Sequence, residues 1–161
     1  MGDDLLALYD VALPDVYGYL IRRCGDRALA EDLTAETFLA AVAAVRTRGA
    51  TDLTPAWAMT VARNKLVDHW RRAAREGPHH EAEEPVDPDD WTEALEEGPA
   101  LAALAALGPH HQAALALRYL DGFSVNEVAR HLDRTVHATE ALLVRARSAF
   151  RRAYGDGGTD G

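Results

Sequence analysis

The chain has 161 residues, of which 48% are hydrophobic and 7% aromatic, and its formal net charge at pH 7 is −9. This length suits one ordinary domain or two small ones, and the single cysteine excludes an intramolecular disulfide and a multi-cysteine zinc site. No apolar run is long enough to span a membrane, and the acidic start is unlike a secretory signal, so we expect a cytoplasmic protein without membrane insertion.

Helical periodicity runs through most of the chain and no alternating strand pattern is present, so we predict an all-α fold. In the first part of the chain we expect helices around residues 5–9, from residue 14 onward and over residues 31–45. After a loop at 49–52, Thr54 and Pro55 are typical of a capped helix start, and this helix can run through Arg75. Further helices are predicted over residues 101–107, 112–120, 125–132 and 136–154.

The helix that ends at Arg75 combines basic side chains with an amide and aromatic rings. Its candidate nucleic-acid contacts are Arg63, Asn64, Lys65, His69, Trp70, Arg71, Arg72 and Arg75. Arginines that hold phosphates and flat groups that accept unstacked bases suit melted DNA, and an Asn can pair with an exposed base edge. The alternative is a solvated basic face, with Trp57 and Trp70 as parts of the core.

An acidic segment divides the chain. Residues 76–97 contain ten Asp and Glu and no Lys or Arg, and Gly-Pro pairs stand at both ends. Such a composition cannot build a core of its own, and the remainder of the chain has 17 bases against 16 acids. We therefore predict two small helical domains joined by a flexible acidic linker. The expected divisions are 1–76, a linker at 77–99, 100–154 and a disordered tail at 155–161.

The segment from Gly122 to Arg152 has the pattern of a helix-turn-helix. Ser124 and Glu127 have the spacing of a capping box, and an apolar stripe follows them. Asp133 tolerates the turn conformation that the break needs, and Thr135 can cap the next helix. The arginines at the end of that helix can reach phosphates. The alternative is an amphipathic hairpin that packs on something else.

An enzyme is disfavoured by what the sequence lacks. The histidine pairs at 79–80 and 110–111 are not accompanied by a zinc-binding motif, and no glycine-rich phosphate loop or nucleophile motif is found. We therefore expect no catalytic residues, no metal and no cofactor. Two other classes stay open on the residues alone: a stand-alone helix-turn-helix transcriptional regulator, and an adaptor whose basic helices are incidental.

Three motifs in order resemble bacterial sigma factors of the extracytoplasmic-function (ECF) group, which keeps only the second and fourth sigma domains. They are AEDLTAETFL at 30–39, the segment from Trp57 through Ala62-Arg63-Asn64 to Arg75, and the helix-turn-helix from Ser124 to Arg147. The resemblance implies a promoter-specificity subunit that binds core RNA polymerase, recognises −35 and −10 promoter elements and helps to open DNA. It also implies an anti-sigma factor as a partner.

The resemblance also assigns sites. In the family the acidic helix docks on a coiled coil of the polymerase β′ subunit, which here implies Glu31, Asp32, Ala35, Glu36 and Leu39. The −10 element would be bound by Arg63, Asn64, Lys65, Trp70, Arg71, Arg72 and Arg75, with the loop at 46–53 beside the flipped base. The −35 element would be bound by Arg134, His137, Glu140, Ala141, Val144, Arg145 and Arg147.

The chain departs from the family pattern at three positions. The family usually has a Lys or Arg where this chain has Glu140, and often another at Leu142. We expect these losses to weaken phosphate binding and to change the preferred −35 bases, and Glu140 can accept a hydrogen bond from a cytosine amino group. Ala113 stands where the family often has an Arg, and the neutral Gln112 beside it does not replace that charge.

Overall fold

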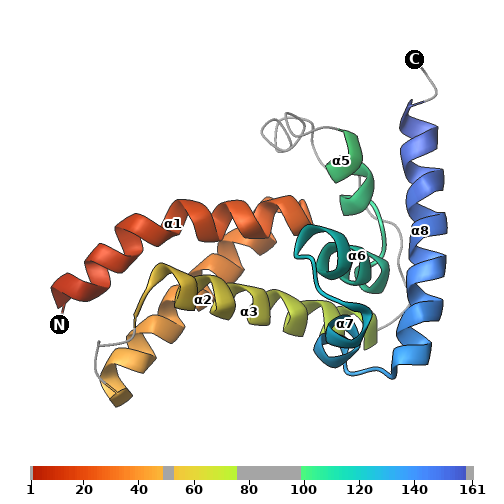
Figure 1. Ribbon diagram of the computed structural model, residues 1–161. Coiled ribbons are helices and arrows are strands. Elements are labelled where there is room, and N and C mark those ends of the chain that lie inside the picture. The colour runs from red at the N-terminus through yellow and green to blue at the C-terminus, as the bar shows by residue number, and fades with distance from the viewer. Residues whose placement is uncertain (1, 49–52, 76–98, 159–161) are drawn as a thin grey trace. The chain divides into compact units, whose positions relative to one another are not determined.

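The computed structural model describes residues 2–48, 53–75 and 99–158, and every regular element in these ranges is helical (Figure 1). The all-α prediction is therefore confirmed. The chain forms two compact units, Met1–Leu66 and Val67–Gly161. None of the helices in the described ranges is both long and apolar enough to cross a lipid bilayer. The expected linker and the loop at 49–52 lie outside the described residues.

The first helix, α1 (Gly2–Cys24), is continuous through Pro14. The expectation of two helices, with Pro14 at the start of the second, is therefore wrong. Proline removes one helical N–H, whose acceptor would be the carbonyl of Asp10. Both Asp10 and Pro14 are exposed, so water can take the place of the missing donor. The buried stripe on the opposite face continues past the proline from Ala12 to Val16, and its packing keeps the helix intact.

The second helix, α2 (Arg27–Arg48), begins four residues before its predicted start. Gly25 has φ of 64° and ends α1, with its N–H donating to Ile21 O at 2.9 Å. Asp26 then caps α2, because its Oδ1 accepts a hydrogen bond from the Leu29 N–H at 3.1 Å. Gly25 and Asp26 therefore form the entire loop between α1 and α2.

The core of the first unit is built from one face of each of its helices. Thr37 is also buried there, and its hydroxyl donates to Leu33 O at 2.8 Å, which satisfies the polar group. The buried apolar side chains are Leu8, Ala12, Val16, Leu20 and Cys24 of α1, Ala30, Leu33 and Ala41 of α2, and Ala58, Ala62 and Leu66 of α3. Small residues on α2 and α3 leave room for the larger ones on α1.

The third helix, α3 (Pro55–Arg75), has the predicted bounds. The Thr54 hydroxyl oxygen accepts a hydrogen bond from the Trp57 N–H at 3.1 Å, so the predicted cap is confirmed. The division between the two compact units falls inside this helix, after Leu66. Its last turns, with Val67 and Trp70 buried, therefore belong to the second unit. This division does not test the predicted end of the first functional domain at residue 76, which stays a prediction.

The second unit continues with α5 (Pro99–Ala105), α6 (Pro109–Leu115), a π-helical turn η2 (Ala116–Leu120), α7 (Val125–Leu132) and α8 (Val136–Gly158). The long α8 packs against α5, α6 and α7 (Figure 1). It runs four residues past Tyr154, where the sequence predicts its end. The large side chains at the centre of this unit are Leu104, Leu117, Val128, Leu142 and Leu143.

Candidate nucleic-acid interface

The predicted capping box at the start of α7 is present. The Ser124 N–H donates to Glu127 Oε1 at 2.8 Å, and the Glu127 N–H donates to Ser124 Oγ at 3.1 Å. These bonds satisfy two backbone donors at the helix start. The hydrogen bond from the Ser124 backbone is the main cause that lowers the pKa of Glu127. A charged Glu127 therefore belongs to the folded state.

The turn between α7 and α8 is made by Asp133 and Thr135, as predicted. Asp133 has φ of 59° and ψ of 48°, the left-handed conformation that a short polar residue tolerates. The Arg134 N–H donates to Ala129 O at 3.0 Å, which closes the end of α7. The Thr135 hydroxyl oxygen accepts from the Ala138 N–H at 3.0 Å and caps α8. Local hydrogen bonds thus set the direction in which α8 leaves the turn.

The first turns of α8 have one buried and one exposed face. The buried face contains Thr139, Leu142, Leu143 and Ala146. The exposed face contains Val136, His137, Glu140, Ala141, Val144 and Arg145, and Arg134 is exposed just before it. An exposed helical face with methyl groups, one carboxylate and one guanidinium can meet the edges of base pairs in a major groove. Arg147 is half-buried and donates through Nη1 to the Tyr119 hydroxyl at 3.2 Å.

The structure corrects one expectation for this helix. Leu142 is 0% exposed, so a side chain at this position faces the core of the unit rather than DNA. The expected loss of a phosphate contact at Leu142 is therefore wrong for this chain. Glu140 is exposed, and its effect on the preferred bases stays a prediction.

Most of the basic groups predicted on α3 lie at its surface. Asn64, Arg72 and Arg75 are exposed, while Arg63, Lys65 and Arg71 are half-buried. The first three recur at intervals of eight and three residues, so they follow one side of the helix. Arg71 Nη2 pairs with Asp68 Oδ1 at 2.9 Å, which neutralises part of the charge on this side.

Trp70 differs from its neighbours because it is only 2% exposed. Its indole Nε1–H donates to Gln112 Oε1 at 2.9 Å, and Gln112 Nε2 donates to the carbonyls of Leu104 and Ala105 at 3.2 Å each. The structure therefore places Trp70 in a core, which was the alternative to base contact. A base can stack on Trp70 only after this packing opens, and the assigned DNA contact stays a prediction. Gln112, which the sequence shows only as a neutral residue, is the polar centre of this part of the unit.

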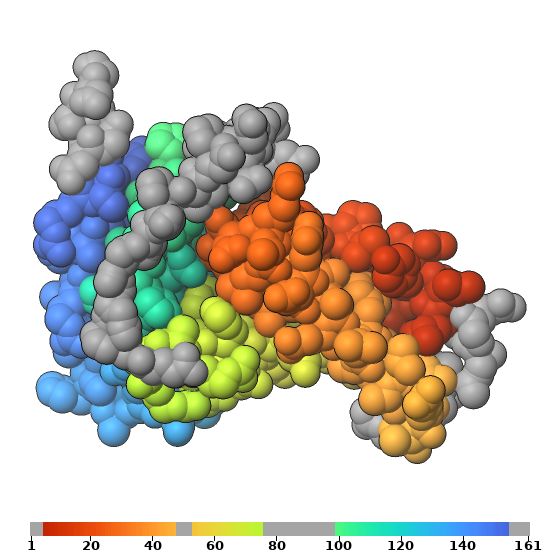
Figure 2. Space-filling view, turned by 180° about the vertical axis from the view of Figure 1, so that it is seen from behind, coloured from red at the N-terminus to blue at the C-terminus, as the bar shows by residue number. Residues whose placement is uncertain are grey.

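On α2, the predicted docking residues share one exposed face. All five of them are exposed, and Leu39 has 65% of its surface open. The opposite face, with Leu33 and Thr37, is buried. In the described part of the chain, Asp32 and Glu36 form no ion pair. Figure 2 shows α2, in orange, at the surface of its unit. An acidic edge beside an open leucine suits a basic partner with an apolar patch.

The described residues contain no group of three or more metal-binding side chains. Cys24 is buried, and its thiol donates to Asp26 O at 3.6 Å. Burial is the main cause that raises the pKa of this thiol to about 12, so it is not a nucleophile near neutral pH.

The sequence matches two family models, sigma-70 region 2 over residues 8–76 and sigma-70 region 4 over residues 98–150. It is 35% identical over 158 residues to the ECF RNA polymerase sigma factor BldN of Streptomyces coelicolor, with 92% of this chain and 60% of BldN covered. It is also 35% identical over 150 residues to the ECF sigma factor SigL of Mycobacterium tuberculosis, with 87% and 84% covered. The chain thus spans less than two thirds of the length of BldN and most of SigL.

Among solved structures, the chain is similar to the sigma factor RpoE of Bartonella quintana, solved in complex with the anti-sigma factor NepR. The TM-score is 0.52 and the identity 22%, with 90% of this chain and 92% of that chain covered. At this identity the likeness concerns the fold.

Proposed function

This chain belongs to the ECF group of RNA polymerase sigma factors, and we propose that it acts as a promoter-specificity subunit of the bacterial enzyme. In this role it binds core polymerase, recognises the −35 and −10 elements and helps to open the DNA for initiation, without chemistry of its own. The observation that carries the proposal is the order of three surface faces along the chain: an acidic face on α2, a basic face on α3 and the outer face of α8.

Polymerase docking is assigned to α2. Glu31, Asp32, Ala35, Glu36 and Leu39 lie on one open face. The carboxylates attract a basic surface such as the family's β′ coiled coil, and Leu39 supplies apolar area to bury on binding. Because the opposite face of α2 is already buried, docking needs no rearrangement of the unit's core.

The −10 element is assigned to α3. Asn64 is exposed and offers both a donor and an acceptor to an unpaired base. Arg63, Lys65, Arg71, Arg72 and Arg75 surround it along the helix and can hold the backbone of the melted strand. Trp70 joins this surface only when its contact with Gln112 is broken. We therefore assign Asn64 and the arginines to the first contact with DNA and Trp70 to a later one.

The −35 element is assigned to the outer face of α8 and to Arg134 before it. Arg145 can bind the acceptor pair on a guanine, Glu140 can accept from a cytosine amino group, and Ala141 and Val144 can contact thymine methyl groups. Arg134, His137 and Arg147 are better placed for the backbone, since they lie at the ends or the side of this face.

The acidic segment 76–97 lies outside the described residues, and its assigned role follows from charge alone. Its ten carboxylates imitate a polyanion, so a polymerase cleft that holds nucleic acid would attract them. Replacing these acids with Asn and Gln at constant length is expected to weaken assembly with core polymerase in low salt, and the difference is expected to shrink as salt rises.

Two further assignments follow from the role. Because core polymerase and the chromosome are in the bacterial cytoplasm, we assign the protein to the cytoplasm. An anti-sigma factor is a fitting partner, since the chain has the fold of a sigma factor solved with NepR. Such a partner would act by covering one or more of the three faces.

The experiment that tests the proposal is run-off transcription with purified core polymerase and genomic DNA fragments. The wild-type chain is expected to direct transcription from a small set of fragments, whereas core polymerase alone does not. Specific duplex binding by the chain without polymerase, with no effect on transcription, would instead identify a stand-alone regulator.

Docking is tested separately with the double variant Asp32→Lys and Glu36→Lys. It is expected to lose affinity for core polymerase, because both changes reverse charge on the docking face. The matched control is Asp10→Lys with Asp15→Lys, which makes the same change of net charge at exposed positions of α1. Equal affinities for the two double variants would show that docking does not use this face of α2.

A further inference from the structure

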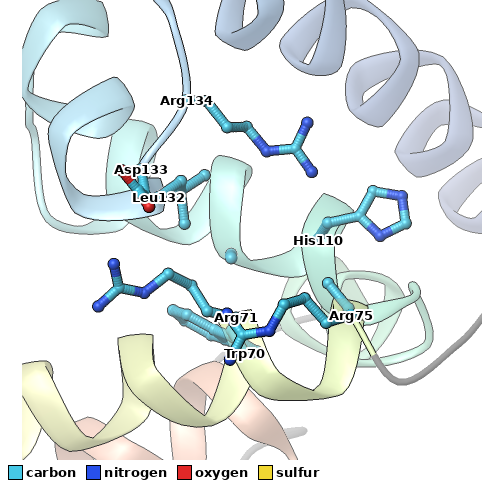
Figure 3. A pocket seen from close by; sticks show the side chains of 9 residues that line it. Trp70, Arg71, Arg75, His110, Leu132, Asp133 and Arg134 are labelled. Carbon is cyan, nitrogen blue, oxygen red and sulfur yellow. The ribbon is translucent and has the colours of Figure 1, made fainter.

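The second unit contains a cavity of about 280 Å³ with four basic side chains in its wall. Figure 3 shows Arg71 and Arg75 of α3, His110 of α6 and Arg134 of the turn before α8 arranged around it. The remaining lining residues are Trp70, Ala74, Ala113, Leu132 and Asp133. Four basic side chains from three segments distant in sequence thus meet at one cavity with a largely apolar floor.

Among the described residues, carboxylates do not balance the positive charge at this cavity. Three arginines face it and Asp133 is the only carboxylate in its wall. Arg71 has a partner in Asp68, which lies outside the wall. The side chains of Arg75 and Arg134 form no ion pair and no hydrogen bond with any residue of the described ranges. Holding like charges together is unfavourable unless an anion compensates them.

His110 adds a group that can respond to an anion. Burial is the main cause that lowers the pKa of its imidazole, and the positive charges of Arg134 and Arg145 add to it. The groups around this ring are Arg71 and Arg75 from α3, His111 on α6, Asp133 and Arg134 from the turn, and Arg145 from α8. A neutral imidazole can donate one N–H to a ligand, and an anion in the cavity favours the doubly protonated ring.

We propose that this cavity is a binding site for a phosphate group. Guanidinium groups offer paired donors that match the oxygens of a phosphate, and the negative charge of a phosphate compensates Arg75 and Arg134, whose side chains have no ion-pair partner among the described residues. The volume is near the lower end of ordinary ligand pockets, so it suits a phosphate with a small attached group. Leu132, Ala74 and Trp70 provide apolar wall for that group.

The phosphate can come from a free phosphate ester, such as a nucleotide, or from the backbone of DNA. Both present the same oxygens to the arginines. The inference does not rest on the proposed function, because binding is a property of the isolated chain. If the proposed function holds as well, a free ligand here competes with promoter DNA, since Arg71, Arg75 and Arg134 are assigned to both.

The test is titration calorimetry on the full chain at constant low ionic strength with three probes: inorganic phosphate, adenosine monophosphate and a six-nucleotide oligothymidylate. The variants Arg75→Gln and Arg134→Gln each remove one guanidinium from the cavity. Each is expected to weaken binding by about tenfold, the loss of one charge-assisted contact. The matched control, Arg151→Gln, removes the same charge from an exposed position of α8 outside the cavity and is expected to change affinity less than twofold.

Each of the following outcomes either supports or overturns the phosphate site. Binding of phosphate and the nucleotide, weakened by the cavity variants only, supports a free phosphate ester as the ligand. Binding of the oligothymidylate alone, with the same pattern of loss, supports the DNA backbone. The proposal is overturned if no probe binds, or if the cavity variants and Arg151→Gln lose affinity equally, since the attraction is then a general effect of charge. Far-UV circular dichroism verifies that all variants remain folded.

Discussion

Replacing Gln112 with leucine tests how firmly the end of α3 is held in the second unit. The change keeps the size of the side chain but removes the acceptor for the Trp70 indole and the donor to two α5 carbonyls. The indole N–H is buried, so losing its partner costs about 1–3 kcal/mol. Leu104 O keeps the Leu107 N–H as a donor at 3.1 Å, which limits the further loss. We expect Gln112→Leu to reduce the free energy of unfolding by about 2–4 kcal/mol in total.

The assay is urea unfolding followed by circular dichroism, with a double-mutant cycle. Trp70→Phe removes the other partner, so the double variant is expected to lose about 1–2 kcal/mol less than the sum of the single losses. Asn126→Leu, which removes an exposed amide from α7, is the control and is expected to stay within about 0.5 kcal/mol of wild type. Additive losses in the cycle, or a Trp70 indole hydrogen that exchanges with solvent at once, would refute the buried contact.

Three further predictions concern the second unit. Ser124→Ala removes the cap of α7 and is expected to reduce the free energy of unfolding in urea by about 1 kcal/mol. Because the pKa of Glu127 is lowered in the folded state, the stability that the capping box contributes is present above the ordinary Glu127 pKa of 4.5 and is lost as pH falls through the folded pKa. The pKa values of His110 and His111 are lowered from 6.5, mainly by burial and also by neighbouring positive charges, so the free energy of unfolding is expected to fall as pH drops below 6.5. Replacing both histidines with Gln is expected to remove this pH dependence from the urea midpoints measured between pH 7.5 and 5.5. Arg145→Ala is expected to reduce discrimination at one −35 base pair by about 1–3 kcal/mol in competition binding of holoenzyme; an equal loss on all sequences would assign Arg145 to phosphate instead.

The features that could be predicted from the sequence depend on neighbours within four residues. The Thr54 cap, the Ser124–Glu127 box and the turn at Asp133 are hydrogen bonds and backbone conformations of this kind, and all three occur as predicted. The exposed face of α2 was also predictable, because helical spacing alone places Asp32 and Glu36 on one side. The match to sigma-70 regions 2 and 4 agrees with these local motifs.

Which of the expected groups are open to a partner depends on tertiary packing. Trp70 stands in a stretch of polar and basic residues, and the family often has a cation at the position of Leu142, yet both residues are buried because each lies on the side of its helix that packs against other helices. Pro14 predicts a helix start, but packing on either side of it keeps α1 continuous. His110 carries no signal in the sequence and acquires its place beside Arg134 through the fold. Helical periodicity gives a residue's angle around its own axis, whereas burial depends on contacts between segments far apart in the chain.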